Sequence, residues 1–99
     1  MSDLNTDLRL AVDTGKISFG SKETMRALNG NKAIAVVIAE KGNAGSIADI
    51  THVCKISEIK LIKFSGNALE LGTVCGKPFP VSSIAIIDSG NSAILKGNY

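Results

Sequence analysis

Two segments of the chain have the residue types of a phosphate-binding helix start. Residues 20–24 read GSKET, and residues 67–72 read NALELG. A helix N-terminus presents unpaired N–H groups and a partial positive charge, both of which suit a phosphate group. Gly20 allows close backbone approach or serves only the tight turn from strand to helix, and Lys22 and Lys77 lie nearby. Two such helix ends at one edge of a sheet could hold a bent nucleic-acid backbone.

Single residues in and near these segments strengthen this interpretation. Lys22 falls in the first turn of a predicted helix, where its charge opposes the helix dipole and folding alone does not favour it. Gly72 falls inside a predicted helix, where glycine costs about 1 kcal/mol relative to alanine. We expect a helix or a ligand to pack against it, and we hypothesise that a passing RNA backbone makes Gly72→Leu damage binding more than folding. Pro78 and Pro80 keep their loop extended, so Phe79 either stacks on an unpaired base or folds onto the core.

Hydrophobic periodicity and capping residues predict the elements that position these residues. The apolar run at 33–39 predicts a central strand covered on both faces. Further strands are expected at residues 16–19, 60–64 and 81–87, and the remainder is expected to be a polar tail. Capping and stop signals predict one helix that ends at Gly15, three helices that begin at Ser21, Ser46 and Asn67, a capping box between Asn67 and Glu70, and a C-terminal glycine, Gly76, for the last helix.

The order of these elements predicts the fold class. Strands alternate with helices, so helices must pack on both faces of the sheet. We predict an α/β fold, a three-layer α/β/α sandwich with about four strands in a mixed, largely parallel sheet. A chain of 99 residues is long enough for one hydrophobic core, and we expect residues 1–99 to form a single domain.

Composition and the scarcity of reactive side chains argue against several function classes. A net charge of +2 means that any nucleic-acid surface is local. We expect no signal peptide, no membrane span, no metal site and no cofactor. Cys54 and Cys75 are expected late in helices as buried apolar residues of a reducing cytosol, and His52 on or near a helix surface. No residue cluster offers a base with a nucleophile, so we expect no enzyme activity.

Four stretches carry a resemblance to a known family. They are residues 14–16 (TGK), 20–24 (GSKET), 69–79 (LELGTVCGKPF) and 84–88 (IAIID). In their order and spacing the chain resembles the archaeal and eukaryotic large-subunit ribosomal protein family L-thirty-e, and the archaeal form in particular. That family belongs to the superfamily of kink-turn RNA-binding proteins. The segment at 69–79 is the specific part, because GSKET alone would fit several branches.

The resemblance implies a structural constituent of the large ribosomal subunit that binds a kinked internal loop of ribosomal RNA. It also implies neighbouring ribosomal proteins, a cytoplasmic ribosomal location and a monomer when free. Where this family often has asparagine the chain has Lys41, which favours a phosphate contact there. The RNA-binding residues implied are Gly20, Ser21, Lys22, Glu23, Arg26, Lys41, Glu70, Leu71, Gly72, Lys77 and Phe79.

Two other functions are compatible with the sequence. One is a kink-turn-binding protein of a guide-RNA modification particle, although that branch usually has asparagine where this chain has Lys22. The other is a small α/β enzyme or small-molecule binder, which would need a concave pocket with a perturbed titratable group.

Overall fold

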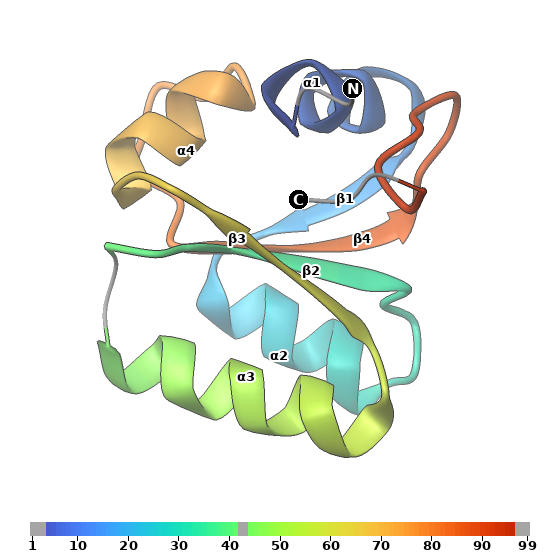
Figure 1. Ribbon diagram of the computed structural model, residues 1–99, viewed down its shortest axis with the longest axis vertical. Helices are drawn as coiled ribbons and strands as arrows, with labels where there is room; N and C mark the ends of the chain where they lie inside the picture. The colour runs from blue at the N-terminus through green and yellow to red at the C-terminus, as the bar shows by residue number, and fades with distance from the viewer. Residues whose placement is uncertain (1–3, 42–43, 97–99) are drawn as a thin grey trace.

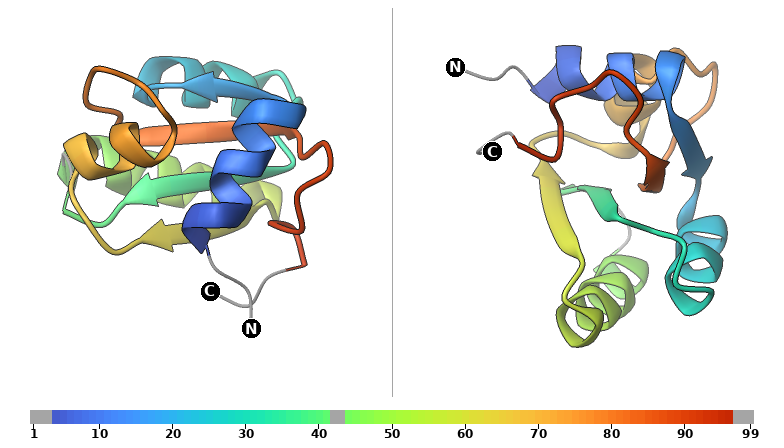
Figure 2. Two further views of the ribbon diagram at one scale, coloured as in Figure 1. Left: turned by 90° about the horizontal axis from the view of Figure 1, so that it is seen from above. Right: turned by 90° about the vertical axis from the view of Figure 1, so that its right-hand side faces the viewer.

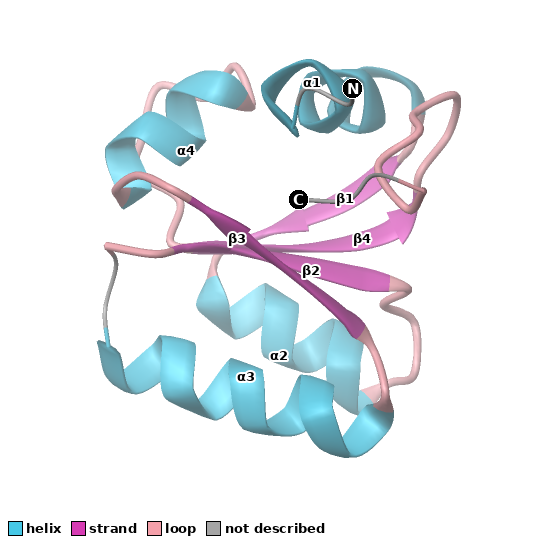
Figure 3. Ribbon diagram, viewed as in Figure 1, coloured by secondary structure: helices cyan, strands magenta, loops and turns pink. Residues whose placement is uncertain are grey.

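The computed structural model describes residues 4–41 and 44–96 and shows a three-layer arrangement (Figures 1 and 3). Helices α1 and α4 cover one face of a four-stranded sheet, and α2 and α3 cover the other. This confirms the predicted α/β/α sandwich. No helix in these ranges is long and apolar enough to cross a membrane. In chain order the elements are α1 (Leu4–Thr14), β1 (Lys16–Phe19), α2 (Ser21–Asn29), β2 (Ala35–Ala39), α3 (Ala44–Ser57), β3 (Lys60–Phe64), α4 (Ala68–Val74) and β4 (Ser83–Asp88).

The order and the directions of the strands are not those of a sheet in which all strands are parallel. The order is β1-β4-β2-β3, and only β2 and β3 pair in parallel. Strands β1, β2 and β3 run in one direction, as the alternation of strands and helices predicts. Strand β4 runs the opposite way and lies between β1 and β2, so both of its pairings are antiparallel. The sheet is therefore mixed, as predicted, but "largely parallel" is wrong for its pairings.

The direction of β4 brings four connecting segments to one edge of the sheet, which we call the loop edge. It comprises residues 20–26, 40–41, 65–67 and 77–82, at the carboxyl ends of β1, β2 and β3 and the start of β4 (Figure 2). Backbone hydrogen bonds tie these segments to their neighbours. The Gly20 N–H donates to the carbonyl of Ser83, the first residue of β4, at 2.8 Å, the Ala39 N–H before Glu40 donates to the Ser82 carbonyl at 2.8 Å, and the Lys41 N–H donates to the Gly66 carbonyl at 3.1 Å. The loops therefore form one connected surface.

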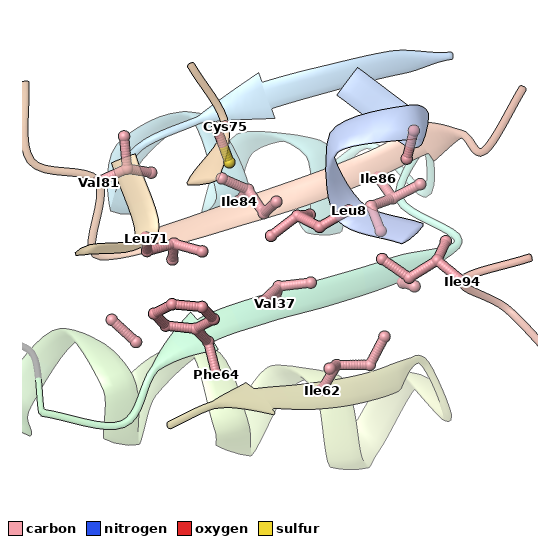
Figure 4. Packing of buried hydrophobic residues seen from close by; sticks show 13 residues of the cluster. Leu8, Val37, Ile62, Phe64, Leu71, Cys75, Val81, Ile84, Ile86 and Ile94 are labelled. Carbon is pink, nitrogen blue, oxygen red and sulfur yellow. The ribbon is translucent and has the colours of Figure 1, made fainter. Parts of the chain in front are cut away.

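The core lies on both faces of the sheet. Strand β2 is buried throughout and alternates its side chains, with Val37 facing α1 and α4 and Val36 facing α2 and α3. Figure 4 shows the first cluster, in which Leu8 of α1 and Leu71 of α4 converge on Val37. Ile94 is also fully buried in this cluster. The prediction of a polar tail after the last strand is therefore wrong, because this part of the chain returns to cover the core.

Two predicted N-caps are wrong and two other helix-end predictions are confirmed. The N-cap of α2 is Gly20 and not Ser21, and no side chain caps it. Helix α3 begins at Ala44, before the predicted cap Ser46. The capping box of Asn67 and Glu70 is present at α4. Gly76 follows the C-cap of α4 with a φ of +78°, and its N–H donates to the Thr73 carbonyl at 3.0 Å, as expected for a helix-terminating glycine.

Two strands are shorter at their starts than predicted, for one physical reason. Strand β2 begins at Ala35 because the Ala33 N–H donates to the Ala27 carbonyl at the end of α2. Strand β4 begins at Ser83 because the Val81 N–H donates to the Ala68 carbonyl of α4 at 2.9 Å. In both cases a helix carbonyl, near the C-terminus of α2 or at the first residue of α4, accepts an N–H group that the hydrophobic pattern assigns to the sheet.

Candidate nucleic-acid interface

The N-terminus of α2 forms the first part of the loop edge. Gly20 has a φ of +95°, a conformation that side-chain-bearing residues rarely adopt, and a Cβ there would meet nothing within 4 Å. The backbone turn therefore requires glycine at this position, and the space in front of the helix is open. The first N–H groups of the helix have no intrahelical acceptor. Lys22 is exposed in this first turn, with Ser21 half-buried beside it.

One face of α2 carries a surface ion pair. Arg26 Nη1 lies 3.3 Å from Glu23 Oε1, and both side chains are largely exposed. Such a pair contributes little to stability, about 0.3–0.5 kcal/mol on a helix. Lys22 takes no part in an ion pair among the described residues, so its charge is available to a ligand.

The segment after β2 brings a second lysine to the loop edge. Lys41 is exposed, and its backbone N–H is held by the carbonyl of Gly66 in the segment after β3. The position of its backbone is thus set by two neighbouring parallel strands, β2 and β3.

Helix α4 differs from the expectation at two of its three predicted site residues. Glu70 is exposed, and its side chain accepts the Asn67 N–H at 3.2 Å as part of the capping box. Leu71 is fully buried, so its side chain is in the core and not on a binding surface. A Cβ on Gly72 would lie 2.1 Å from the Phe79 carbonyl oxygen. The close neighbour of Gly72 is thus the protein's own loop, and the expectation that a larger residue would preserve folding is wrong.

The loop from α4 to β4 presents an aromatic ring. Phe79, between two prolines, is 47% exposed, so it does not fold back onto the core. Lys77 Nζ lies 4.6 Å from the centroid of the Phe19 ring at the end of β1, a cation–π contact. This contact joins the loop to the residue that precedes Gly20. The loop before β4 and the start of α2 are therefore neighbours on the loop edge.

Sequence analysis missed Arg9 at this loop. A Cβ at Gly76 would lie 2.7 Å from Arg9 Nη1, so the guanidinium of α1 packs against the first turn of the loop. Arg9 also pairs with Asp13 at 3.2 Å. No local signal could have found this contact, because Arg9 and Gly76 are far apart in the sequence and their approach depends on how α1 and α4 pack.

The described residues offer no chemistry for catalysis. Cys54 and Cys75 are buried free thiols, as predicted. Burial raises the pKa of both, that of Cys75 to about 11, although the charges of Lys77 and Arg9 act in the opposite direction on Cys75. Both thiols are therefore protonated and unreactive near neutral pH. His52 is exposed on α3, and no group of residues within 4–41 and 44–96 could hold a metal ion.

Comparison with known proteins decides among the remaining possibilities. The ribosomal protein L7Ae/L30e/S12e/Gadd45 family matches residues 2–96. The chain belongs to this family. Its similarity to individual members extends over nearly the whole chain.

Three archaeal relatives illustrate this similarity, and each is a large ribosomal subunit protein eL30. That of Methanothermobacter thermautotrophicus is 42% identical over 94 residues, 95% of this chain and 96% of the relative. That of Sulfurisphaera tokodaii is 38% identical over 96 residues, 97% of this chain and 91% of the relative. That of Methanococcus maripaludis (strain C5) is 36% identical over 96 residues, with the same coverage of 97% and 91%. The chain therefore belongs to a family of ribosomal proteins, and these archaeal relatives are ribosomal proteins and not enzymes.

Proposed function

We propose that this protein is a structural constituent of the large ribosomal subunit that binds a kinked internal loop of ribosomal RNA. One structural observation carries the RNA-binding part: the loop edge places the open N-terminus of α2, the exposed charges of Lys22 and Lys41, and the exposed ring of Phe79 on one connected surface. Residues 1–99 would act as one RNA-binding domain, monomeric when free, in the cytoplasmic ribosome beside other ribosomal proteins.

The chemistry of this surface suits a kinked loop better than a regular duplex. The α2 N-terminus and the two lysines attract phosphate groups without reading sequence. A sharp kink brings phosphates together and turns bases outward, and an outward base can stack on an aromatic ring such as Phe79. Glu23 is an exposed carboxylate in the first turn of α2, and we propose that it accepts hydrogen bonds from base edges, with Gly20 and Ser21 allowing close backbone approach.

The other two functions have less support. The relatives are named as large-subunit proteins, and Lys22 stands where the guide-RNA branch usually has asparagine. A small-molecule site would need a perturbed titratable group in a pocket, and among the described residues only the buried Cys54 and Cys75 have clearly shifted pKa values.

The proposed function predicts a preference for RNA shape. The purified protein should bind an RNA with an asymmetric, kinked internal loop more tightly than a fully paired duplex of the same length. The major groove of an A-form duplex is too deep and narrow for the α2 N-terminus and Phe79 to read. A gel-shift titration of both RNAs at one salt concentration measures the difference, and equal affinities would refute the assignment.

Lys22→Ala should weaken RNA binding and flatten its salt dependence. Each phosphate contact contributes about 0.7–0.9 to the slope of log affinity against log salt, so the slope should fall by roughly that amount. Lys55→Ala is the matched control, because Lys55 is exposed near the end of α3 at the opposite edge of the sheet. Lys60 is a poorer control, since its Nζ donates to the Leu95 carbonyl at 3.0 Å. If Lys22→Ala and Lys55→Ala behave alike, Lys22 is only a solvated surface charge.

A further inference from the structure

A groove lies between α2 and β1. Only one end of it, at Glu23 and Arg26, belongs to the loop edge. It has a volume of about 340 Å³. Small residues leave room for it: Ser18 on β1, Ala27 on α2 and Gly30, the C-cap of α2, line it together with Ile87 of β4. Strand β1 is an edge strand of the sheet, so no further strand closes the groove on its outer side.

The groove carries an excess of positive charge. Lys16, Arg26 and Lys32 line it together with one carboxylate, Glu23. Glu23 is already paired with Arg26 at 3.3 Å. Lys16 and Lys32 are exposed, and neither has an ion pair among the described residues. Two uncompensated cations therefore face one hollow, whereas the net charge of the whole chain is only +2.

The groove runs along β1, from the loop edge at the carboxyl end of this strand toward the other end of the strand. Helix α2 starts at the loop edge and runs antiparallel to the direction of β1, so Glu23 and Arg26 lie nearer the loop edge than Lys16 and Lys32. The nine residues of α2 span about 13 Å at 1.5 Å per residue. Positive charge is thus spread along the groove, from Arg26 near the loop edge to Lys16 and Lys32 at the other end.

We infer that this groove binds the sugar–phosphate backbone of a paired RNA stem that flanks the kinked loop. The inference rests on the proposed function, because the loop edge must first hold the kink. A phosphate backbone matches a line of separated cations along the groove. The one large apolar side chain that lines the groove, Ile87 of β4, is half-buried. The contact would position the stem without reading its sequence.

The test is the double variant Lys16→Ala/Lys32→Ala measured on two RNAs. One RNA carries the kinked loop with the shortest stems that stay paired, and the other has each stem lengthened by a full helical turn. On the long RNA the salt slope should fall by about 1.4–1.8, as expected for two phosphate contacts. On the short RNA the affinity and the slope should match the wild type. Lys16→Arg/Lys32→Arg should retain the wild-type slope on both, because the charge remains.

Other outcomes would separate this inference from the proposed function. A double alanine variant with an unchanged slope on the long RNA, alongside a weakened Lys22→Ala, would overturn the groove and leave the proposed function intact. If that variant instead self-associates with its RNA slope unchanged, the lysines serve to protect the exposed edge of β1, and the inference fails. A wild-type protein with no preference for the kinked RNA would overturn the proposed function itself. Thermal unfolding of each variant checks that these exposed substitutions leave the fold intact.

Discussion

Gly72→Leu should lower the thermal stability of the protein strongly. A Cβ at this position would lie 2.1 Å from the carbonyl oxygen of Phe79, and the loop cannot simply move away. The Lys77 N–H donates to the Gly72 carbonyl at 2.9 Å, and the Val81 N–H to the Ala68 carbonyl at 2.9 Å, so both ends of the loop are tied to α4. Overpacking typically costs about 1–3 kcal/mol, and a clash with backbone atoms belongs at the upper end of that range. Because 1 kcal/mol shifts Tm by about 4–8 °C in a domain of this size, the loss should exceed roughly 10 °C.

Gly72→Ala isolates the cause. Alanine is the better helix former by about 1 kcal/mol, so helix propensity alone predicts a gain in stability, whereas the contact with the Phe79 carbonyl predicts a loss. Thr73→Ala is the matched control in the same helix, since Thr73 is exposed and the change should be neutral or slightly stabilising. Tm values from thermal denaturation decide the matter. A Gly72→Ala protein as stable as the wild type would show that the loop yields and that the surface near Gly72 is adaptable.

The sequence predicted those elements whose signals are local. Lys16–Phe19 and Lys60–Phe64 are confirmed to the residue, because alternating apolar residues and flanking polar residues mark a strand within a few positions. The capping box at Asn67 is likewise a signal contained in four residues. Local hydrogen bonds and local periodicity decide these features, and no distant contact competes with them.

The features that sequence reasoning missed depend on distant contacts. Strand β4 runs opposite to the other strands because the chain re-enters the sheet from the loop edge after α4, and its place between β1 and β2 depends on pairing with strands far away in the sequence. The burial of Ile94 and the approach of Arg9 to Gly76 likewise depend on packing between segments far apart in the chain. Hydrophobic periodicity cannot predict such contacts, because it compares only residues within one element.

The predictions for the candidate site divide in the same way, into those that local signals decide and those that distant contacts decide. A glycine inside a helix correctly signalled a close neighbour at Gly72, but it could not tell a ligand from the protein's own loop. Leu71 falls in the most specific stretch of the resemblance, yet the structure shows that its side chain fills the core. By contrast, the prolines on either side of Phe79 predicted an extended loop, and the ring is exposed as one of the two expectations required.

Phe79→Ala should reduce affinity for the kinked RNA and leave the fold almost unchanged. Stacking of a base on an aromatic side chain is worth about 1–3 kcal/mol, so the dissociation constant should rise by roughly 5- to 150-fold. The ring is 47% exposed and outside the two core clusters, so the change in the free energy of unfolding should stay near 0.5 kcal/mol. Gel-shift titration and thermal unfolding of the same preparations measure both quantities.

Two further variants show whether the flat face of the ring is what matters. Phe79→Tyr keeps that face and should bind within a few-fold of the wild type, whereas Phe79→Leu keeps only the apolar bulk and should resemble the alanine variant. Ile56→Ala is the control for loss of exposed apolar surface, because Ile56 is 68% exposed near the end of α3, at the edge opposite the loops. Wild-type affinity in Phe79→Leu would mean that Phe79 contributes bulk and not stacking, and the base-binding role of this loop would have to be abandoned.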